Sequence, residues 1–178
     1  MDRDGVINED FGYVHTPERL KFVDGIFDLC KLAQSSKFKI IIVTNQAGIG
    51  RGYYTEAEFL VFMNHVKKKF KENSIEVDAI YFCPHHPEYG VGSYRRECSS
   101  RKPNSGMLLK AIVDFDLDPE LCIMIGDQET DMKAALRSKI KRRYLFSQRP
   151  MNYTDTYFEV IKSLESVDLD FEDKGNDK

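Results

Sequence analysis

The sequence lacks the features of a membrane or secreted protein. No apolar run approaches the roughly 18–20 residues that a helix needs to cross a bilayer. A charged pair follows Met1, where a signal peptide would carry a hydrophobic run. We therefore expect a cytoplasmic protein.

The sequence also has no excess of positive charge and few cysteines. The formal net charge is −3 at pH 7, so the composition gives no reason to expect nucleic acid as a partner. A solvated surface explains the two short basic runs at 67–69 and 141–143. The chain has 4 cysteines, and in a reducing compartment these predict core positions or a metal site and not disulfide bonds.

What is present is typical of one globular domain. A chain of 178 residues with 42% hydrophobic and 31% charged residues is long enough to bury a core. We expect this domain to span residues 1–167, followed by an acidic and disordered tail over 168–178. We also expect a monomer that acts on a small molecule.

Strand-like and helix-like segments alternate along the chain. β-Branched apolar runs predict buried strands, and apolar residues at helical spacing predict the helices between them. This alternation indicates an α/β, Rossmann-like three-layer fold with a parallel sheet. Strands are expected at 38–44, 78–82, 121–125 and 144–146, and helices from Asp24 (as N-cap), at 55–70, 104–115, 129–137 and 155–164.

Polar clusters stand where strands of this sheet end or helices begin. In parallel sheets, ligands bind beyond the carboxyl ends of the strands. Four clusters are therefore expected to meet at one rim. They are Asp2 with Asp4, 44–46, Arg101 with Lys102, and Asp127.

The residue types at this rim fit the hydrolysis of a phosphate ester. Asp2, Asp4 and Asp127 would repel one another without a cation, and oxygen ligands favour Mg²⁺. Thr44 and Lys102 would supply donors to phosphoryl oxygens. An aspartate nucleophile would divide the reaction into two steps through an aspartyl-phosphate, and a second carboxylic acid would protonate the leaving oxygen.

Four ordered motifs read DRDGV at 2–6, TNQ at 44–46, RKP at 101–103 and GDQETD at 126–131. Together they resemble the motifs of the haloacid-dehalogenase (HAD) phosphatase superfamily. Stretches 11–15 and 83–87 are similar to the heptose-bisphosphate phosphatases of that superfamily. The resemblance extends from Asp2 to about Ser147. It implies an enzyme that removes the 7-phosphate of D-glycero-D-manno-heptose 1,7-bisphosphate in lipopolysaccharide-core and surface-heptose biosynthesis.

The resemblance also implies roles for the motif residues. Asp2 would be the nucleophile and Asp4 the general acid/base. Mg²⁺ would be held by Asp2, the backbone carbonyl of Asp4 and Asp127. Thr44 and Lys102 would steady the phosphoryl group. The residues expected to contact substrate are Asp10, Phe11, Gly12, Tyr13, Asn45, Gln46, Arg101 and Gln128.

Two positions of the last motif allow more than one interpretation. Gln128 stands where these phosphatases usually carry a lysine. Glutamine can donate a hydrogen bond to phosphate but brings no charge, so affinity or substrate preference could differ. Asp131 would either orient Lys102 or lie exposed on a helix.

The segment 83–102 resembles the zinc loop of that family, whose ligands follow the pattern Cys-x-His and then Cys-x-Cys. Cys83, His85 and Cys98 match three ligand positions, and Ser100 stands at the fourth. A serine hydroxyl is a poor zinc ligand. Either a neighbouring side chain or water completes a zinc shell, or packing alone holds the loop.

The start of the chain departs from the pattern. A buried central strand should lead into Asp2, yet only Met1 precedes it. Absence of that strand would expose its neighbours and leave the nucleophile poorly anchored. We therefore expect a truncated first strand, with Met1 a truncated or misassigned start.

The spacing of the motifs leaves no room for a separate cap domain. Loops at 8–21 and 83–100 are expected to cover an open site. Two other functions stay open. A histidinol-phosphate phosphatase would share the motifs and the cysteine/histidine loop. A truncated, non-catalytic relic would fit the missing strand and the changes at Ser100 and Gln128, although the four motifs are intact.

Overall fold

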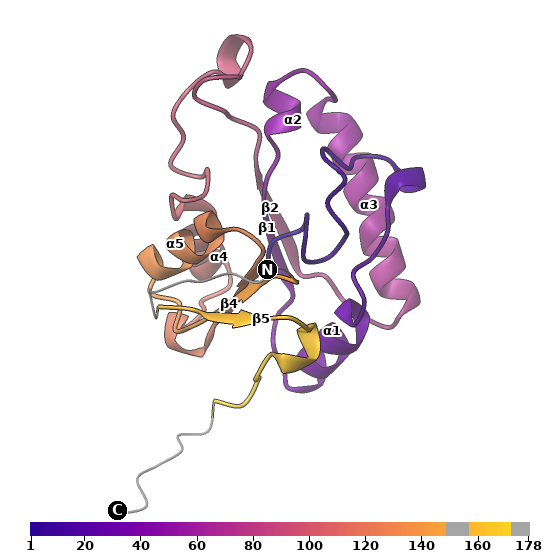
Figure 1. The fold of residues 1–178 in the computed structure, drawn as a ribbon, viewed down its shortest axis with the longest axis vertical. Coiled ribbons are helices and arrows are strands. Elements are labelled where there is room, and N and C mark those ends of the chain that lie inside the picture. Colours follow the sequence, from indigo (N-terminus) through magenta and orange to yellow (C-terminus); the bar gives the residue numbers. More distant parts are fainter. Residues whose placement is uncertain (149–156, 172–178) are drawn as a thin grey trace, which may run out of the picture.

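The computed structural model describes residues 1–148 and 157–171 (Figure 1). Short 3₁₀ helices occur at Pro17–Arg19, Gly92–Tyr94, Pro119–Leu121 and Leu164–Ser166. In the described ranges no helix is long and apolar enough to cross a membrane. The strands are β1 (Ile41–Asn45), β2 (Ala79–Cys83), β3 (Ile123–Gly126), β4 (Arg142–Phe146) and β5 (Glu159–Ile161), and the α-helices are α1 (Ile26–Ser35), α2 (Ala47–Gly50), α3 (Glu56–Glu72), α4 (Gly106–Asp114) and α5 (Glu129–Arg137).

All strand pairs of the sheet are parallel. β1 pairs with β2, and β3, β4 and β5 form a second group in that order. The backbone of Met1 and Asp2 lies between the two groups: the Val43 N–H donates to the Met1 carbonyl and the Asp2 N–H to the Ile125 carbonyl, each at 2.9 Å. The first two residues thus connect β1 to β3.

Side chains on the two faces of the sheet belong to two hydrophobic clusters. Ile42 and Ile125 pack in one cluster with residues of α1 and α3. Their neighbours Val43 and Met124 pack in the other cluster with residues of α4 and α5. Alternation of adjacent strand residues between opposite faces explains the two clusters. The expected three-layer architecture is confirmed.

Helix α3 follows its sequence signature closely. The Thr55 N–H donates to Glu58 at 2.7 Å, and the Glu58 N–H donates to the Thr55 hydroxyl at 3.1 Å, which completes a capping box. The apolar stripe of the helix is buried against the core. It consists of Phe59, Phe62, Met63, Val66 and Phe70.

Two expected helical features are wrong. Asp24 does not cap α1, because Gly25 is the N-cap in a left-handed conformation (φ +82°) and no side chain caps the helix. No α-helix forms over 157–164, because β5 pairs there with β4 and buries Ile161. Residues 155–156, where that helix was expected to begin, lie outside the described residues.

The end of the described chain lies against β4. The Arg142 guanidinium donates to the Asp168 carbonyl at 2.9 Å and lies 4.1 Å from the centre of the Phe171 ring. Residues 172–178 of the expected tail lie outside the described residues. The domain boundary at 167 therefore stays a prediction.

An apolar cavity of about 860 Å³ lies between β1 and β3, beside Met1. Its walls include Ile41 and Val43 of β1 and Ile123 of β3, together with residues of α1 and α4. The Met1 amine donates to the Ile41 carbonyl at 2.8 Å, and burial lowers its pKa to about 6. The cavity has the apolar walls and flanking strands that an additional strand would need.

A short apolar extension fused ahead of Met1 is expected to stabilise the protein. Five residues such as Val, Ile or Leu would fill the cavity and replace a buried amine by an amide. Apolar burial should outweigh the ordering cost, with a gain of about 2 kcal/mol or more in the free energy of unfolding. Urea denaturation measures the gain, and a Gly/Ser extension of equal length is the control. Equal stability of the two extended proteins would contradict the prediction.

Candidate active site

Asp2 lies buried at the edge of the sheet where β1 and β3 end. Its Oδ1 accepts the Arg3 N–H at 2.7 Å and lies 2.9 Å from the Lys102 ammonium. Burial raises the pKa of Asp2 to about 7, the charge of Lys102 opposes this rise, and the charge of Asp131 adds to it. Asp2 is therefore a desolvated carboxyl group whose charge state depends on its neighbours.

Lys102 brings three segments of the chain together. Its buried ammonium lies 2.9 Å from Asp2 and 2.6 Å from Asp131, and it donates to the Val43 carbonyl at 2.9 Å. Burial alone would lower the pKa of Lys102, but Asp2 and Asp131 raise it. Asp131 is thus a buried partner of Lys102, which favours the orienting role over the exposed position.

The Asn45 side chain holds the backbone of Lys102. Its amide donates to the Lys102 carbonyl and accepts the Lys102 N–H, both at 3.0 Å. This pair of bonds occupies both ends of the Asn45 amide. A contact of Asn45 with substrate stays a prediction.

Three carboxylates come close enough to share a cation. One oxygen from each of Asp2, Asp127 and Asp131 lies within 4.8 Å of the others. Burial raises the pKa of Asp127 to about 6. Hard oxygen donors around a small space fit Mg²⁺, whose charge would favour the ionised forms.

Gly5 lets the backbone approach this cluster closely. It has φ +80°, and a Cβ atom there would lie 2.4 Å from Oδ2 of Asp127. No other residue fits at this position without displacing Asp127. The turn after Asp4 therefore brings main-chain atoms next to the carboxylates, as a metal ligand from the Asp4 carbonyl would require.

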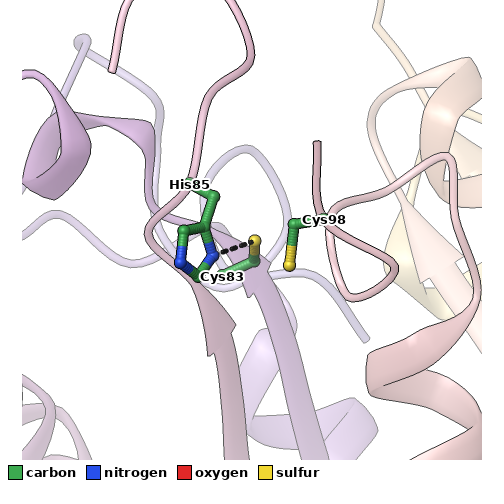
Figure 2. Close-up of side chains that lie close together, drawn as sticks. All are labelled: Cys83, His85 and Cys98. Atoms are coloured by element: carbon green, nitrogen blue, oxygen red, sulfur yellow. Dashed lines mark hydrogen bonds between the residues drawn. The ribbon is translucent and has the colours of Figure 1, made fainter. Parts of the chain in front are cut away.

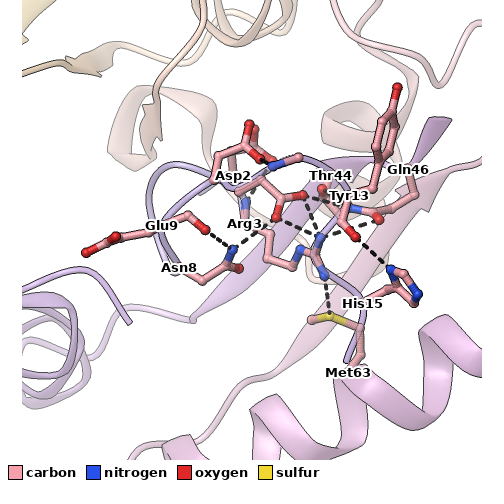
Figure 3. A network of polar contacts seen from close by, with 12 residues as sticks. Asp2, Arg3, Asn8, Glu9, Tyr13, His15, Thr44, Gln46 and Met63 are labelled. Atoms are coloured by element: carbon pink, nitrogen blue, oxygen red, sulfur yellow. Dashed lines mark hydrogen bonds and ion pairs between the residues drawn. The ribbon is translucent and has the colours of Figure 1, made fainter. Parts of the chain in front are cut away.

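The Asp4 carboxylate makes three side-chain contacts, with Arg3, Asn8 and Gln46. Figure 3 shows these three partners within one polar network. Nη2 of Arg3 lies 2.6 and 2.7 Å from its two oxygens, and Asn8 and Gln46 donate at 3.0 and 3.2 Å. Arg3 is fully buried and lies over the ring of Phe62 at 5.2 Å. The sequence analysis assigned no role to Arg3 or Asn8, although an arginine between two motif aspartates was a signal for the first.

Gln46 connects Asp4 to the Thr44 hydroxyl. Its amide donates to Thr44 at 2.8 Å, and its carbonyl accepts the Tyr54 hydroxyl at 2.6 Å. Both Gln46 and Thr44 are buried, with 1% exposure. These bonds assign Gln46 a supporting position, and its contact with substrate stays a prediction.

The other expected substrate residues lie around the rim. Phe11 and Tyr13 are exposed in the first loop, where Asp10 accepts the Gly12 N–H at 2.8 Å. Gln128 donates to Oδ2 of Asp127 at 2.7 Å, next to the carboxylate cluster. The Arg101 guanidinium donates to the His85 carbonyl at 3.1 Å.

A second cluster joins the two ends of the 83–102 loop (Figure 2). Ligand atoms of Cys83, His85 and Cys98 lie within 4.8 Å of one another, with 3.6 Å between the Cys83 sulfur and Nδ1 of His85. Burial raises the pKa of the Cys83 thiol to about 12. Burial would also raise the pKa of Cys98, but hydrogen bonds from Ser100 and Cys83 lower it. These sulfur and nitrogen donors suit zinc.

Known proteins resemble the chain in sequence and in structure. A family model described as HAD-hyrolase-like matches residues 99–142. The D-glycero-alpha-D-manno-heptose-1,7-bisphosphate 7-phosphatase of Burkholderia mallei is 46% identical over 90% of this chain and 85% of the relative. The D-glycero-beta-D-manno-heptose-1,7-bisphosphate 7-phosphatase of Haemophilus influenzae is 43% identical over 82% of this chain and 78% of the relative.

A solved structure has the same fold. It is the D,D-heptose 1,7-bisphosphate phosphatase from B. bronchiseptica complexed with magnesium and phosphate. The match has a TM-score of 0.75 at 24% identity and covers 92% of this chain and 90% of that one. The expected fold class is confirmed.

Replacement of the buried ammonium should strongly destabilise the protein. Lys102→Met leaves Asp2 and Asp131 without their shared cation, at an expected cost of about 3–5 kcal/mol in the free energy of unfolding. The loss should be smaller at pH 5 than at pH 8, because the carboxyl groups can then take up protons. Urea denaturation at both pH values measures it.

Lys110→Met is the matched control, because Lys110 pairs with Asp114 on the exposed face of α4. It should change stability little. Equal losses in the free energy of unfolding of the two variants would contradict the prediction that the buried Lys102 ammonium stabilises this site.

Proposed function

This chain belongs to the D-glycero-D-manno-heptose-1,7-bisphosphate 7-phosphatase family of the HAD superfamily, and we propose that it hydrolyses the 7-phosphate of that heptose bisphosphate. The buried Asp2 beside Lys102 and Asp127 is the observation that carries the proposal. The product would enter nucleotide-activated heptose biosynthesis. Cytoplasmic location and a monomeric state remain expectations.

In the first step, Asp2 attacks phosphorus and displaces the sugar oxygen. Oδ1 of Asp2 contacts Arg3 and Lys102, which leaves Oδ2 for the attack. The phosphorus–sugar bond breaks as the phosphorus–Asp2 bond forms, and Asp4 gives a proton to the leaving oxygen. In the second step, Asp4 takes a proton from water, which attacks phosphorus and frees Asp2 and inorganic phosphate.

Charge balance during these steps comes from several groups. Lys102 and the Thr44 hydroxyl face the phosphoryl oxygens, and Arg3 keeps Asp4 in position. Asp2, Asp127 and the Asp4 carbonyl would hold Mg²⁺, which supplies positive charge to the phosphoryl oxygens. The magnesium named for the solved relative supports this metal.

Two substitutions separate the proposed roles of the aspartates. Asp2→Asn should abolish phosphate release from the heptose bisphosphate and prevent covalent phosphorylation of the protein. Asp4→Asn should slow release by about 10²–10⁴-fold, with a smaller loss on p-nitrophenyl phosphate, whose leaving group needs no proton. Phosphate-release assays with Mg²⁺ and with chelator measure these effects. Asp28→Asn, on the exposed side of α1, is the control.

Histidinol phosphate is the rival substrate in the same assay. Both anomers of the heptose bisphosphate are also compared, because this chain is similar to relatives named for the alpha anomer and to relatives named for the beta anomer. Faster turnover of histidinol phosphate would overturn the substrate assignment. Activity retained by Asp2→Asn would overturn the mechanism.

The second cluster supplies three of the four ligands of a tetrahedral zinc site. Cys83, His85 and Cys98 would hold the ion and fasten the 83–102 loop. Because Ser100 replaces the fourth thiolate, we expect less than one zinc per chain after purification without added metal.

Ser100→Cys is expected to raise the zinc content to about one per chain. Elemental analysis measures the content, and Ser99→Cys, one residue away on the exposed surface, is the control. Stoichiometric zinc in the unaltered protein would show that another ligand completes the site. Failure of Ser100→Cys to raise the content would contradict this geometry.

A further inference from the structure

Tyr54 is a buried residue in the turn between α2 and α3, with 5% exposure. Its ring stacks on the imidazole of His15 from the loop at 8–21, with 4.3 Å between the ring centres and 12° between the planes. The ring also lies against Gly48 of α2, where a Cβ atom would come within 2.3 Å of it. These contacts leave the ring little freedom, so they fix the position of its hydroxyl group. Burial raises the pKa of Tyr54 to about 12, so the hydroxyl keeps its proton at neutral pH.

This hydroxyl meets the side chain of Gln46, which uses all of its hydrogen-bonding capacity. Oε1 of Gln46 accepts the Tyr54 hydroxyl at 2.6 Å and lies 3.5 Å from Nη2 of Arg3. Nε2 of Gln46 donates to Thr44 at 2.8 Å and to Asp4 at 3.2 Å. A primary amide has two hydrogens to donate and two lone pairs on its oxygen, so each of them has a partner. The amide is therefore held with its nitrogen toward Asp4 and its oxygen toward Tyr54.

Asp4 changes its charge during the proposed reaction, whereas Tyr54 does not. An ionised Asp4 accepts strongly from Nε2 of Gln46, which favours this orientation of the amide. Once Asp4 is protonated and ready to protonate the leaving oxygen, that attraction weakens. If the amide then turned over, its oxygen would face Asp4 and compete with the leaving oxygen for the proton. Tyr54 opposes the turn, because its hydroxyl would then face a donor in place of an acceptor.

We propose that Tyr54 is a positioning residue, which keeps the Gln46 carbonyl turned away from Asp4 so that the proton of Asp4 goes to the leaving oxygen. This inference rests on the proposed function. The stack on His15 also connects the loop at 8–21 to the general acid, because a displacement of that loop would shift the Tyr54 hydroxyl.

The experiment compares Tyr54→Phe with the unaltered enzyme on heptose 1,7-bisphosphate and on p-nitrophenyl phosphate. The substitution keeps the ring and removes only the hydroxyl. The leaving oxygen of the heptose bisphosphate needs a proton, so kcat/KM for this substrate should fall about three- to tenfold, as expected for one lost hydrogen bond. The leaving group of p-nitrophenyl phosphate needs no proton, so its kcat/KM should stay within about twofold.

A double-mutant cycle tests whether the hydroxyl acts through Gln46. Gln46→Met keeps the approximate size of the side chain and removes the amide. Addition of Tyr54→Phe to this variant should then change kcat/KM for the heptose bisphosphate by less than about twofold. A further fall as large as that in the single variant would show that Tyr54 acts independently of Gln46, and would contradict the inference.

Tyr81→Phe is the matched control, because the Tyr81 hydroxyl donates to Asp114 of α4 at the same distance of 2.6 Å. This substitution should leave kcat/KM for both substrates unchanged. Equal falls on both substrates in Tyr54→Phe would show that Tyr54 only supports the fold, and an unchanged kcat/KM for the heptose bisphosphate would also overturn the inference.

Failure of the proposed function has a different result, because the unaltered enzyme would then release no phosphate from the heptose bisphosphate. Histidinol phosphate, whose leaving oxygen also needs a proton, would replace it in the same comparison with p-nitrophenyl phosphate.

Discussion

A buried ammonium group holds this site together. Lys102 contacts Asp2 near the start of the chain, the Val43 carbonyl in β1 and Asp131 in α5. A buried charge is costly unless its partners are well placed, so each partner is needed by the other two. The fold and the proposed chemistry therefore depend on the same charge. The arrangement that positions Asp2, the proposed nucleophile, also connects helix α5 to the sheet.

Close backbone approach gives the site its second constraint. Gly5 lies against Asp127, and Gly126 lies against Asp131, where a Cβ atom would come within 2.3 Å of that side chain. Because neither glycine has a side chain, Asp127 can approach the backbone at Gly5 and Asp131 can approach the backbone at Gly126. The position of the carboxylates is therefore limited by main-chain packing as well as by charge.

Much of the fold and the site followed from local sequence patterns. The β-branched runs before Asn45 and Gly126 predicted strands, and the polar residues after them were correctly expected at one rim. The same reasoning wrongly predicted a helix where β5 lies. This strand has three residues and forms by pairing with β4, which is distant in sequence. A short segment of this kind carries too little periodicity to distinguish a strand from a helix.

Arg3 was missed for a related reason. A charged residue is normally expected at the surface, and its burial here depends on Phe59 and Phe62, which are distant in sequence. Side chains that act through contacts between distant segments leave no local pattern.

The backbone bonds of Met1 and Asp2 have a mechanical consequence. They form a seam between the β1–β2 and β3–β4–β5 parts of the sheet, and the residue on one side of that seam is the proposed nucleophile. A fluctuation that opened the seam would carry Asp2 away from Lys102 before either part of the sheet lost its own pairing. Opening the seam would then cost less free energy than global unfolding, and activity would be lost first. The temperature range in which this enzyme is active would therefore depend on the strength of the seam.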